Sequence, residues 1–282
     1  MIRFGPAGNC KTFYEAGYKH SVEEPKWLKS IGLSAFEFSF GRGIILSDET
    51  AVELGNEARK YDIEVSIHAP YYINFANPDD EMVEKSYNYV INSLQKLKLI
   101  GGKRLVVHPA SCGKLKREDA LELVNKRLLI LKSKLEELGL NDYLICLETM
   151  GKPAQIGTYQ EVIDMCKLSP NYIPTLDFGH INALGQGCLK TEDDYRKVID
   201  YLFKTLGEEK AKKVHIHFSK IEYGDKGEIR HLTMEDNKYG PEFEPLAKLL
   251  KEYNMEPVVI CESSELMAHD ALILKNIYDN VK

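Results

Sequence analysis

Eight short apolar runs alternate with longer amphipathic segments along this chain of 282 residues. The apolar runs are Ile2–Pro6, Ala35–Phe40, Val65–Ala69, Arg104–His108, Leu144–Glu148, Ile173–Asp177, Val214–Phe218 and Pro257–Glu262. Segments with helical periodicity lie between them, clearest at Met82–Ile100, Ala120–Leu138, Asp193–Leu206, Phe243–Tyr253 and Met267–Tyr278. Because the runs are almost continuously apolar, they are typical of parallel strands covered on both faces. The alternation predicts an α/β fold.

The number of repeats and the chain length distinguish between parallel-sheet folds. Eight strand–helix pairs within about 250–280 residues match a (β/α)8 barrel, the TIM barrel. A doubly wound open sheet is the alternative, but its first turn usually reads G-x-G-x-x-G, whereas this chain has Gly5-Pro6-Ala7-Gly8 there. No linker divides the sequence, so we expect residues 1–282 to form a single TIM-barrel domain. The longest irregular stretch, roughly 219–241, is rich in Gly and charge and predicts an active-site loop.

Composition limits the possible partners and compartments. The net charge of −6 and the pI near 5.8 exclude a generally basic protein that coats nucleic acid. A local nucleic-acid site stays open, because bound metal can supply positive charge. No apolar run reaches the roughly 18 residues of a membrane span, and the first residues lack the layout of a signal peptide. The 6 cysteines include no C-x-x-C pair, so we expect reduced thiols and a cytoplasmic protein.

Six successive strands, the third to the eighth, each carry a potential metal ligand at or near their carboxyl end. These residues are His68, His108, Glu148, Asp177 with His180, His215 and Glu262, and His231 follows in the loop after the seventh strand. The carboxyl ends of barrel strands meet at the face where catalytic groups gather. So many carboxylates and imidazoles in one place need a cation, because buried charges without partners cost several kcal/mol. Histidine and carboxylate ligands without cysteine suit Zn²⁺, Mn²⁺ or Fe²⁺.

In two places, neighbouring residues of the same type compete for one functional role: a histidine pair on the seventh strand and a tyrosine pair after the third. His217 follows His215 by two positions and shares its face of the strand. We predict that His215 is the ligand and that His217 supports it or bonds elsewhere. After His68, the loop carries Tyr71 and Tyr72, and we expect one ring to stack on a base or sugar and the other to be structural.

The segments around these residues match a known pattern in order from about residue 65 onward. They read HAPYYINFANPD (68–79), VVHPAS (106–111), LETMGKPAQIG (147–157), LDFGH (176–180), VHIHFSK (214–220), RHL (230–232) and CES (261–263). Together they resemble the endonuclease IV family of apurinic/apyrimidinic (AP) endonucleases, a branch of the xylose isomerase-like barrels. The resemblance implies a zinc-dependent phosphodiesterase of base excision repair that cuts double-stranded DNA 5′ to abasic sites, with Mn as a possible substitute. We expect it to act as a monomer.

The resemblance also implies roles for individual residues. It places a first zinc on His68, His108 and Glu148, with Glu148 bridging to a second zinc held by Asp177, His215 and Glu262. His180 and His231 would hold a third zinc. The third-metal carboxylate of the family stands two residues before the last histidine, where this chain has Ile229, while Glu228 is adjacent. Glu148 and Glu262 are also the expected catalytic carboxylates.

The DNA-contacting residues are less completely matched. Tyr71 corresponds to a family tyrosine, and Asn74 lies in the same segment, so both are expected to contact substrate. Arg42 is the candidate for insertion into a duplex, in a segment, FEFSFGRG, that otherwise lacks the polar and aromatic pattern of active members.

Two other functions remain open on the sequence. One is a sugar isomerase or epimerase on the same barrel, in which Glu148, Asp177, His215 and Glu262 hold one Mn²⁺ or Mg²⁺ and the two glutamates exchange a proton. It leaves His68, His108 and His231 without a role. The other is a damaged-DNA-binding homologue that keeps metal but has lost turnover, as the residue at position 229 suggests. The number of metal ions per chain distinguishes the first alternative from the nuclease.

Overall fold

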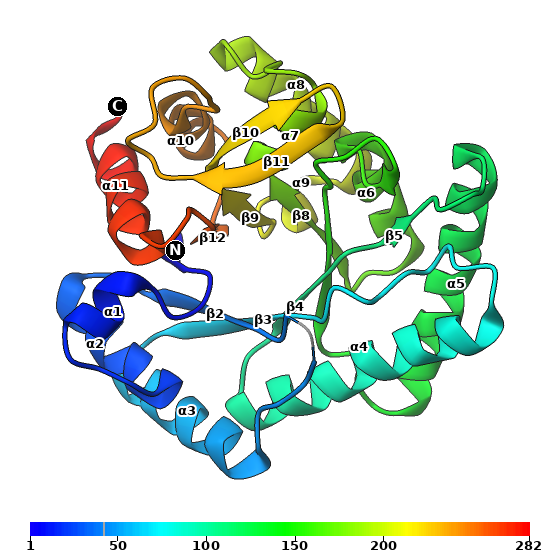
Figure 1. Cartoon of the computed structure of the whole chain (residues 1–282), viewed down its shortest axis with the longest axis horizontal. Coiled ribbons are helices and arrows are strands. Elements are labelled where there is room, and N and C mark those ends of the chain that lie inside the picture. Colours follow the sequence, from blue (N-terminus) through cyan, green and yellow to red (C-terminus); the bar gives the residue numbers. More distant parts are fainter. Residues whose placement is uncertain (42) are drawn as a thin grey trace.

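The eight apolar runs form the eight parallel strands of one sheet in the computed structural model, which describes residues 1–41 and 43–282 (Figure 1). The strands are β1 (Arg3–Pro6), β2 (Ala35–Ser39), β3 (Glu64–His68), β4 (Arg104–Val107), β6 (Leu144–Glu148), β8 (Tyr172–Asp177), β9 (His215–Phe218) and β12 (Val258–Cys261). Their order in the sheet is β1-β12-β9-β8-β6-β4-β3-β2, so each strand lies beside its neighbours in sequence. The predicted TIM barrel is confirmed.

The barrel closes where β1 meets β2. The Ser34 N–H donates to the Phe4 carbonyl (3.0 Å), and the Gly8 N–H donates to the Glu37 carbonyl (2.8 Å). Gly5 makes this approach possible, because a Cβ at this position would lie 1.8 Å from the Ala35 carbonyl oxygen.

Helices surround the sheet and cover its outer face. They are α1 (Lys11–Glu15), α2 (Glu24–Ile31), α3 (Asp48–Tyr61), α4 (Asp80–Ile100), α5 (Arg117–Glu137), α6 (Tyr159–Met165), α7 (Phe178–Leu184), α8 (Glu192–Leu206), α9 (Glu208–Ala211), α10 (Phe243–Glu252) and α11 (Met267–Asn280). Single 3₁₀ turns cover Ser21–Glu23 and Cys166–Leu168. Within the described residues, no helix is both long and apolar enough to span a membrane.

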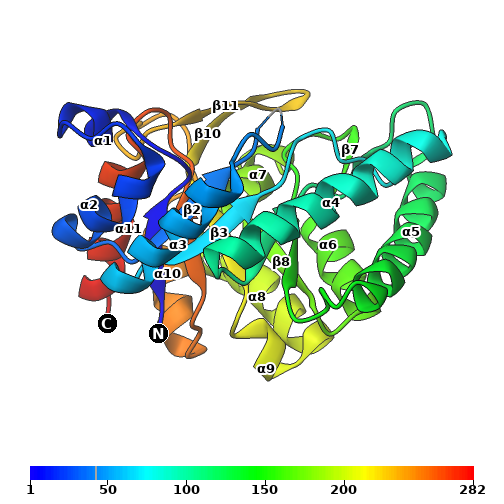
Figure 2. The ribbon, with the colours of Figure 1, turned by 90° about the horizontal axis from the view of Figure 1, so that it is seen from below.

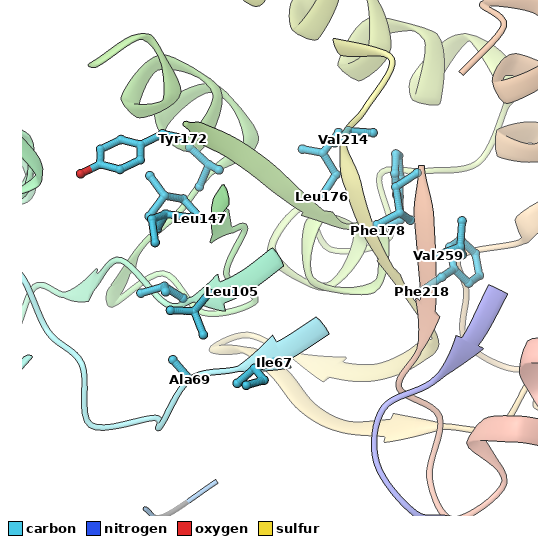
Figure 3. Close-up of a cluster of buried hydrophobic side chains, with 14 of the residues drawn as sticks. Ile67, Ala69, Leu105, Leu147, Tyr172, Leu176, Phe178, Val214, Phe218 and Val259 are labelled. Atoms are coloured by element: carbon cyan, nitrogen blue, oxygen red, sulfur yellow. The ribbon is translucent and has the colours of Figure 1, made fainter. Parts of the chain in front are cut away.

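Side chains along each strand alternate between two environments. Outward-facing residues such as Ile67, Leu147 and Phe218 pack against the helices in the main core (Figure 3). The residues between them point into the barrel, since successive strand side chains face opposite sides. Near the amino-terminal end of the barrel, some of these form a small apolar cluster of Ala35, Val258 and Ile260. Toward the carboxyl ends they become histidine and carboxylate.

Two short antiparallel pairs lie on the loops after the strands. β5 (Ala110–Ser111) pairs with β7 (Gln155–Ile156), and β10 (Lys220–Gly224) pairs with β11 (Gly227–Leu232). The β10–β11 hairpin falls within the stretch 219–241, which the sequence predicted to be irregular, so that expectation was wrong for this part. Figure 2 shows the hairpin at the end of the barrel opposite the two termini.

Candidate metal centre

A first group of ligand atoms forms at the ends of β3, β4 and β6. The Nε2 atoms of His68 and His108 lie 3.1 Å and 3.0 Å from the same oxygen, Glu148 Oε2. His68 Nδ1 lies 2.8 Å from the Ala69 carbonyl oxygen, which fixes the ring and leaves Nε2 directed at Glu148. The structure therefore brings together the three residues expected to hold the first metal.

A second group shares Glu148 with the first. Its members are Glu148, Asp177, His217 and Glu262, whose ligand atoms lie within 4.8 Å of one another. His217 Nδ1 lies 3.3 Å from Glu148 Oε1 and 3.4 Å from Glu262 Oε2. Because Oε2 of Glu148 faces the first group and Oε1 the second, this carboxylate links the two.

His217, not His215, belongs to the second group, which corrects the sequence-based choice. The register of β8 and β9 pairs Asp177 with His217 and Thr175 with His215. His215 therefore lies one inward-facing layer deeper in the barrel, where it contacts Glu37. The sequence shows that both histidines share a face, but only the register shows which one is level with Asp177.

A third group combines the start of α7 with the β10–β11 hairpin. Glu228 lies between two histidines, with Oε2 3.4 Å from His180 Nε2 and Oε1 3.8 Å from His231 Nε2. His180 Nδ1 lies 2.9 Å from the Thr149 carbonyl oxygen, and His231 Nδ1 lies 2.8 Å from Ser219 Oγ. Each ring is thus held through one nitrogen while the other faces Glu228.

A β-bulge explains why Glu228 takes the place expected of residue 229. In β10–β11, Glu222 is opposite Arg230, but the next residue, Tyr223, is opposite Glu228, so Ile229 is the additional residue. In a regular strand, residues three apart face opposite sides, and one extra residue restores a common side. The bulge therefore places Glu228 beside His231 and leaves Ile229 59% exposed. The residue at position 229 does not remove a carboxylate from this group.

Burial and close charges set the protonation of these ligands. Burial alone would raise the pKa of Glu148, but His108 and His217 outweigh it and hold that pKa well below its usual value. Burial lowers the pKa of His68, yet the contact with Glu148 outweighs this and raises it to about 9. Burial raises the pKa of Asp177, and His180 only partly offsets this effect. The pKa values of His180 and His217 are also raised, because the neighbouring carboxylates outweigh burial, so these two rings and His68 carry, as protons, positive charge that a bound cation would otherwise provide.

The groups open into one cavity of about 480 Å³. Its wall includes His68, Tyr71, His108, Glu148, Lys152, His180, Glu228, His231 and Glu262. The Tyr71 ring stacks on His108, with centroids 5.6 Å apart, whereas Tyr72 lies beside Tyr89 at 6.3 Å. Lys152 adds an ammonium group that the sequence did not single out, with Nζ 4.0 Å from Glu228 Oε2.

Asn74, a predicted substrate contact, does not line this cavity. Asn74 Oδ1 accepts hydrogen bonds from the backbone N–H groups of Ala76 (3.0 Å) and Ser111 (3.2 Å), so its amide holds the loop instead of lining the cavity. Arg42 lies outside the described residues.

The donor set fits divalent metal. Glu148, Asp177 and Glu262 are three carboxylates in one buried group, and Asp177 Oδ2 has no hydrogen-bond partner among the described residues. Such a group is unfavourable without a cation. Mixed imidazole and carboxylate ligands, without cysteine, match Zn²⁺ or Mn²⁺ chemistry.

Comparison with known proteins places this barrel among relatives. The family model described as xylose isomerase-like TIM barrel matches residues 25–277. An uncharacterized protein of Methanocaldococcus jannaschii is 33% identical over 254 residues, covering 90% of each chain. A protein named probable endonuclease 4, from Mycoplasmopsis synoviae, is 31% identical over 203 residues, covering 70% of this chain and 68% of the relative.

Two solved structures with different names share the fold. Endonuclease IV from Thermus thermophilus superposes with a TM-score of 0.74 at 20% identity, covering 99% of this chain and 100% of the other. A D-tagatose 3-epimerase-like protein superposes with a TM-score of 0.72 at 19% identity, covering 99% of this chain and 96% of the other. At these identities the likeness concerns the fold alone. The matched length and the relatives together show that this chain belongs to the xylose isomerase-like TIM barrel family.

Proposed function

We propose that this chain is a zinc-dependent phosphodiesterase of the endonuclease IV type, which cuts duplex DNA 5′ to abasic sites. The observation that carries the proposal is the presence of three ligand groups around one cavity, with Glu148 shared by two of them. A one-metal sugar epimerase needs only the second group and leaves His68, His108, His180, Glu228 and His231 without a role. The relatives named probable endonuclease 4 support the same choice.

The ligand residues form three candidate metal positions. His68, His108 and Glu148 would hold one ion, Glu148, Asp177, His217 and Glu262 a second, and His180, Glu228 and His231 a third. When bound, the ions would supply Lewis acidity, which makes water a stronger nucleophile near neutral pH and offsets the charge of a phosphodiester.

The remaining contacts suit a phosphodiester substrate. Glu262 lines the cavity and is ionised at working pH, because His217 outweighs the effect of burial and holds its pKa at about 2. It can therefore accept a hydrogen bond from an attacking water and orient it. The Lys152 ammonium attracts the phosphate, and the Tyr71 ring offers a face for the sugar beside His108. A cavity of about 480 Å³ takes one extruded nucleotide unit, not a duplex.

The test is cleavage of a defined abasic duplex combined with a metal count. The purified chain, loaded with zinc, is incubated with a duplex that carries one tetrahydrofuran abasic analogue and with an intact duplex of the same sequence. We expect a nick 5′ to the analogue only, three metal ions per chain by elemental analysis, and loss of nicking in Glu262→Gln. No nicking with Zn²⁺, Mn²⁺ or Mg²⁺ contradicts the proposal. One ion per chain together with ketose epimerisation supports the epimerase instead.

A further inference from the structure

A fourth cluster of titratable side chains lies directly beneath the second group and shares one residue, His217, with it, while its other two members have no role in the function proposed above. It consists of Glu37 on β2 and of His215 and His217 on β9. All three side chains are fully buried. Sequence reasoning missed Glu37, although a lone charged residue in the apolar run AFEFSF is an available signal.

Glu37 contacts both histidines with different oxygens. Oε2 accepts a hydrogen bond from Ser66 Oγ (2.7 Å) and lies 3.0 Å from His215 Nε2. Oε1 lies 2.9 Å from His217 Nε2 as a close ion-pair contact, and neither of these two atoms has a hydrogen-bond partner in the described part of the chain. Glu37 therefore lies between the two rings and is the group next to the lower nitrogen of His217.

His217 can serve only one of the two clusters as a neutral metal ligand. Its Nδ1 faces Glu148 and Glu262, and its Nε2 faces Glu37. A neutral imidazole has one lone-pair nitrogen and one N–H. If Nδ1 binds the ion of the second group, Nε2 carries the proton. If Nε2 binds an ion beside Glu37, Nδ1 carries the proton and the second group loses its histidine.

The charges around the ring favour the first arrangement. The upper side offers three carboxylates that need a cation, from Glu148, Asp177 and Glu262. The lower side offers one carboxylate, and its Oε2 is already engaged by Ser66 and His215. A carboxylate behind a ligating histidine holds the ring in one tautomer and orientation.

We infer that Glu37 is a positioning residue, which holds the proton of His217 on Nε2 so that Nδ1 is the metal-binding atom of the second group. This inference rests on the metal centre proposed above, but not on its substrate. It assigns the deep cluster to support of the second metal, not to a fourth ion.

The experiment observes the His217 ring itself. Full-length protein labelled with ¹⁵N-histidine is titrated with Zn²⁺ and followed by long-range ¹H–¹⁵N NMR, with the His217 signals assigned from their loss in His217→Asn. We expect Nδ1 to shift as a metal ligand and Nε2 to stay protonated. In Glu37→Gln, the Zn²⁺ concentration that half-saturates this shift should rise about tenfold, and in Glu37→Ala up to about a hundredfold.

Glu24→Gln is the matched control. Glu24, on α2, is also a fully buried glutamate, but neither of its oxygens has a hydrogen-bond partner among the described residues, and it lies in none of the ligand groups found there. Its variant should leave the His217 shift and its midpoint unchanged. If Glu37→Ala fails to fold, Glu37→Gln and the tautomer of the unmodified protein still decide the question.

Three results overturn the inference: ligation through Nε2, an unchanged midpoint in Glu37→Gln and Glu37→Ala, or no zinc-dependent shift of His217 at all. None of them depends on DNA. If the protein fails to cut an abasic duplex while the Glu37 variants still shift the midpoint, the proposed function fails and the role of Glu37 stands.

Discussion

Two regions of the molecule supply ligand atoms to the same cavity, and their backbones hold them in different ways. Glu148 and Asp177 end strands that are hydrogen-bonded to a neighbour on each side, and they are 1% and 0% exposed. Glu228 and His231 lie on a two-stranded hairpin, and their side chains keep 16% and 26% of their accessible area. The barrel thus fixes the spacing of its ligands, whereas the hairpin accepts an extra residue by forming a bulge.

The largest expected effect follows from removing the carboxylate shared by two groups. Glu148→Gln keeps the size of the side chain but removes the charge next to His68, His108 and His217. We expect elemental analysis to show about two fewer ions per chain, and abasic-site cleavage to fall at least about a thousandfold. If two or more ions remain, Glu148 does not link the strand-end groups.

A change in the hairpin should affect only the third group. Glu228→Ala should remove one ion, leave the other two, and lower cleavage by roughly a hundredfold.

Two further variants, Ile229→Asp and a deletion of Ile229, test the β-bulge in the hairpin. Ile229→Asp should change cleavage less than about twofold, because the side chain at 229 points away from the group.

Deletion of Ile229 should keep the third ion, because it removes the extra residue and places Glu228 two positions before His231 on a regular strand. Loss of the ion on deletion, or its retention in Glu228→Ala, contradicts this account of the hairpin. Metal content per chain is the measurement in each case.

The pH dependence of zinc binding should reveal the proton that His68 carries in the first, strand-end group. His68 has a pKa of about 9 in the metal-free protein, because Glu148 outweighs the effect of burial. Zinc binds neutral imidazole, so below pH 9 it must displace this proton, and affinity should rise about tenfold per pH unit until it levels off near pH 9. The ion of the first group should show the same slope in Glu228→Ala, because that change lies outside the group. A flat profile between pH 6 and 8, in competition with a chelator, contradicts the prediction.

The smallest effect concerns the two tyrosines after β3. Tyr71→Ala removes the ring stacked on His108 and should raise KM for abasic duplex about fivefold to tenfold, with a smaller change in kcat. Tyr72→Ala is the matched control, since its ring lies beside Tyr89 and does not line the cavity. Equal effects of the two variants count against a substrate contact for Tyr71.

The sequence predicted the barrel well because each strand produces a local signal. The eight apolar runs correspond to the eight strands to within one residue at each end, and a strand end places its ligand at a known face of the fold. The choice between His215 and His217 failed because it depends on the pairing of β9 with β8, which no local pattern encodes.

The hairpin was missed for a related reason. Its first strand alternates apolar side chains over only four residues, with Ile221 and Tyr223, and its second strand does not alternate, so the local signal is weak. The bulge also hides the relation between Glu228 and His231. Asn74 carries a side chain suited to contact substrate, but its Oδ1 already accepts hydrogen bonds from two nearby backbone N–H groups. The sequence does not reveal these local partners.

The contact between β1 and β2 has a consequence for the chemistry. The carboxylate of Glu37 contacts His217, and the backbone carbonyl of Glu37 accepts a hydrogen bond from the Gly8 N–H. Glu37 lies on β2, the strand that β1 can approach only because residue 5 is glycine. A single methyl group at residue 5 would force these two strands apart. A substitution at residue 5, which is not one of the proposed ligands, would then displace the backbone of Glu37 beneath the His217 ring. The metal affinity proposed for this centre would therefore depend on the absence of one carbon atom at residue 5.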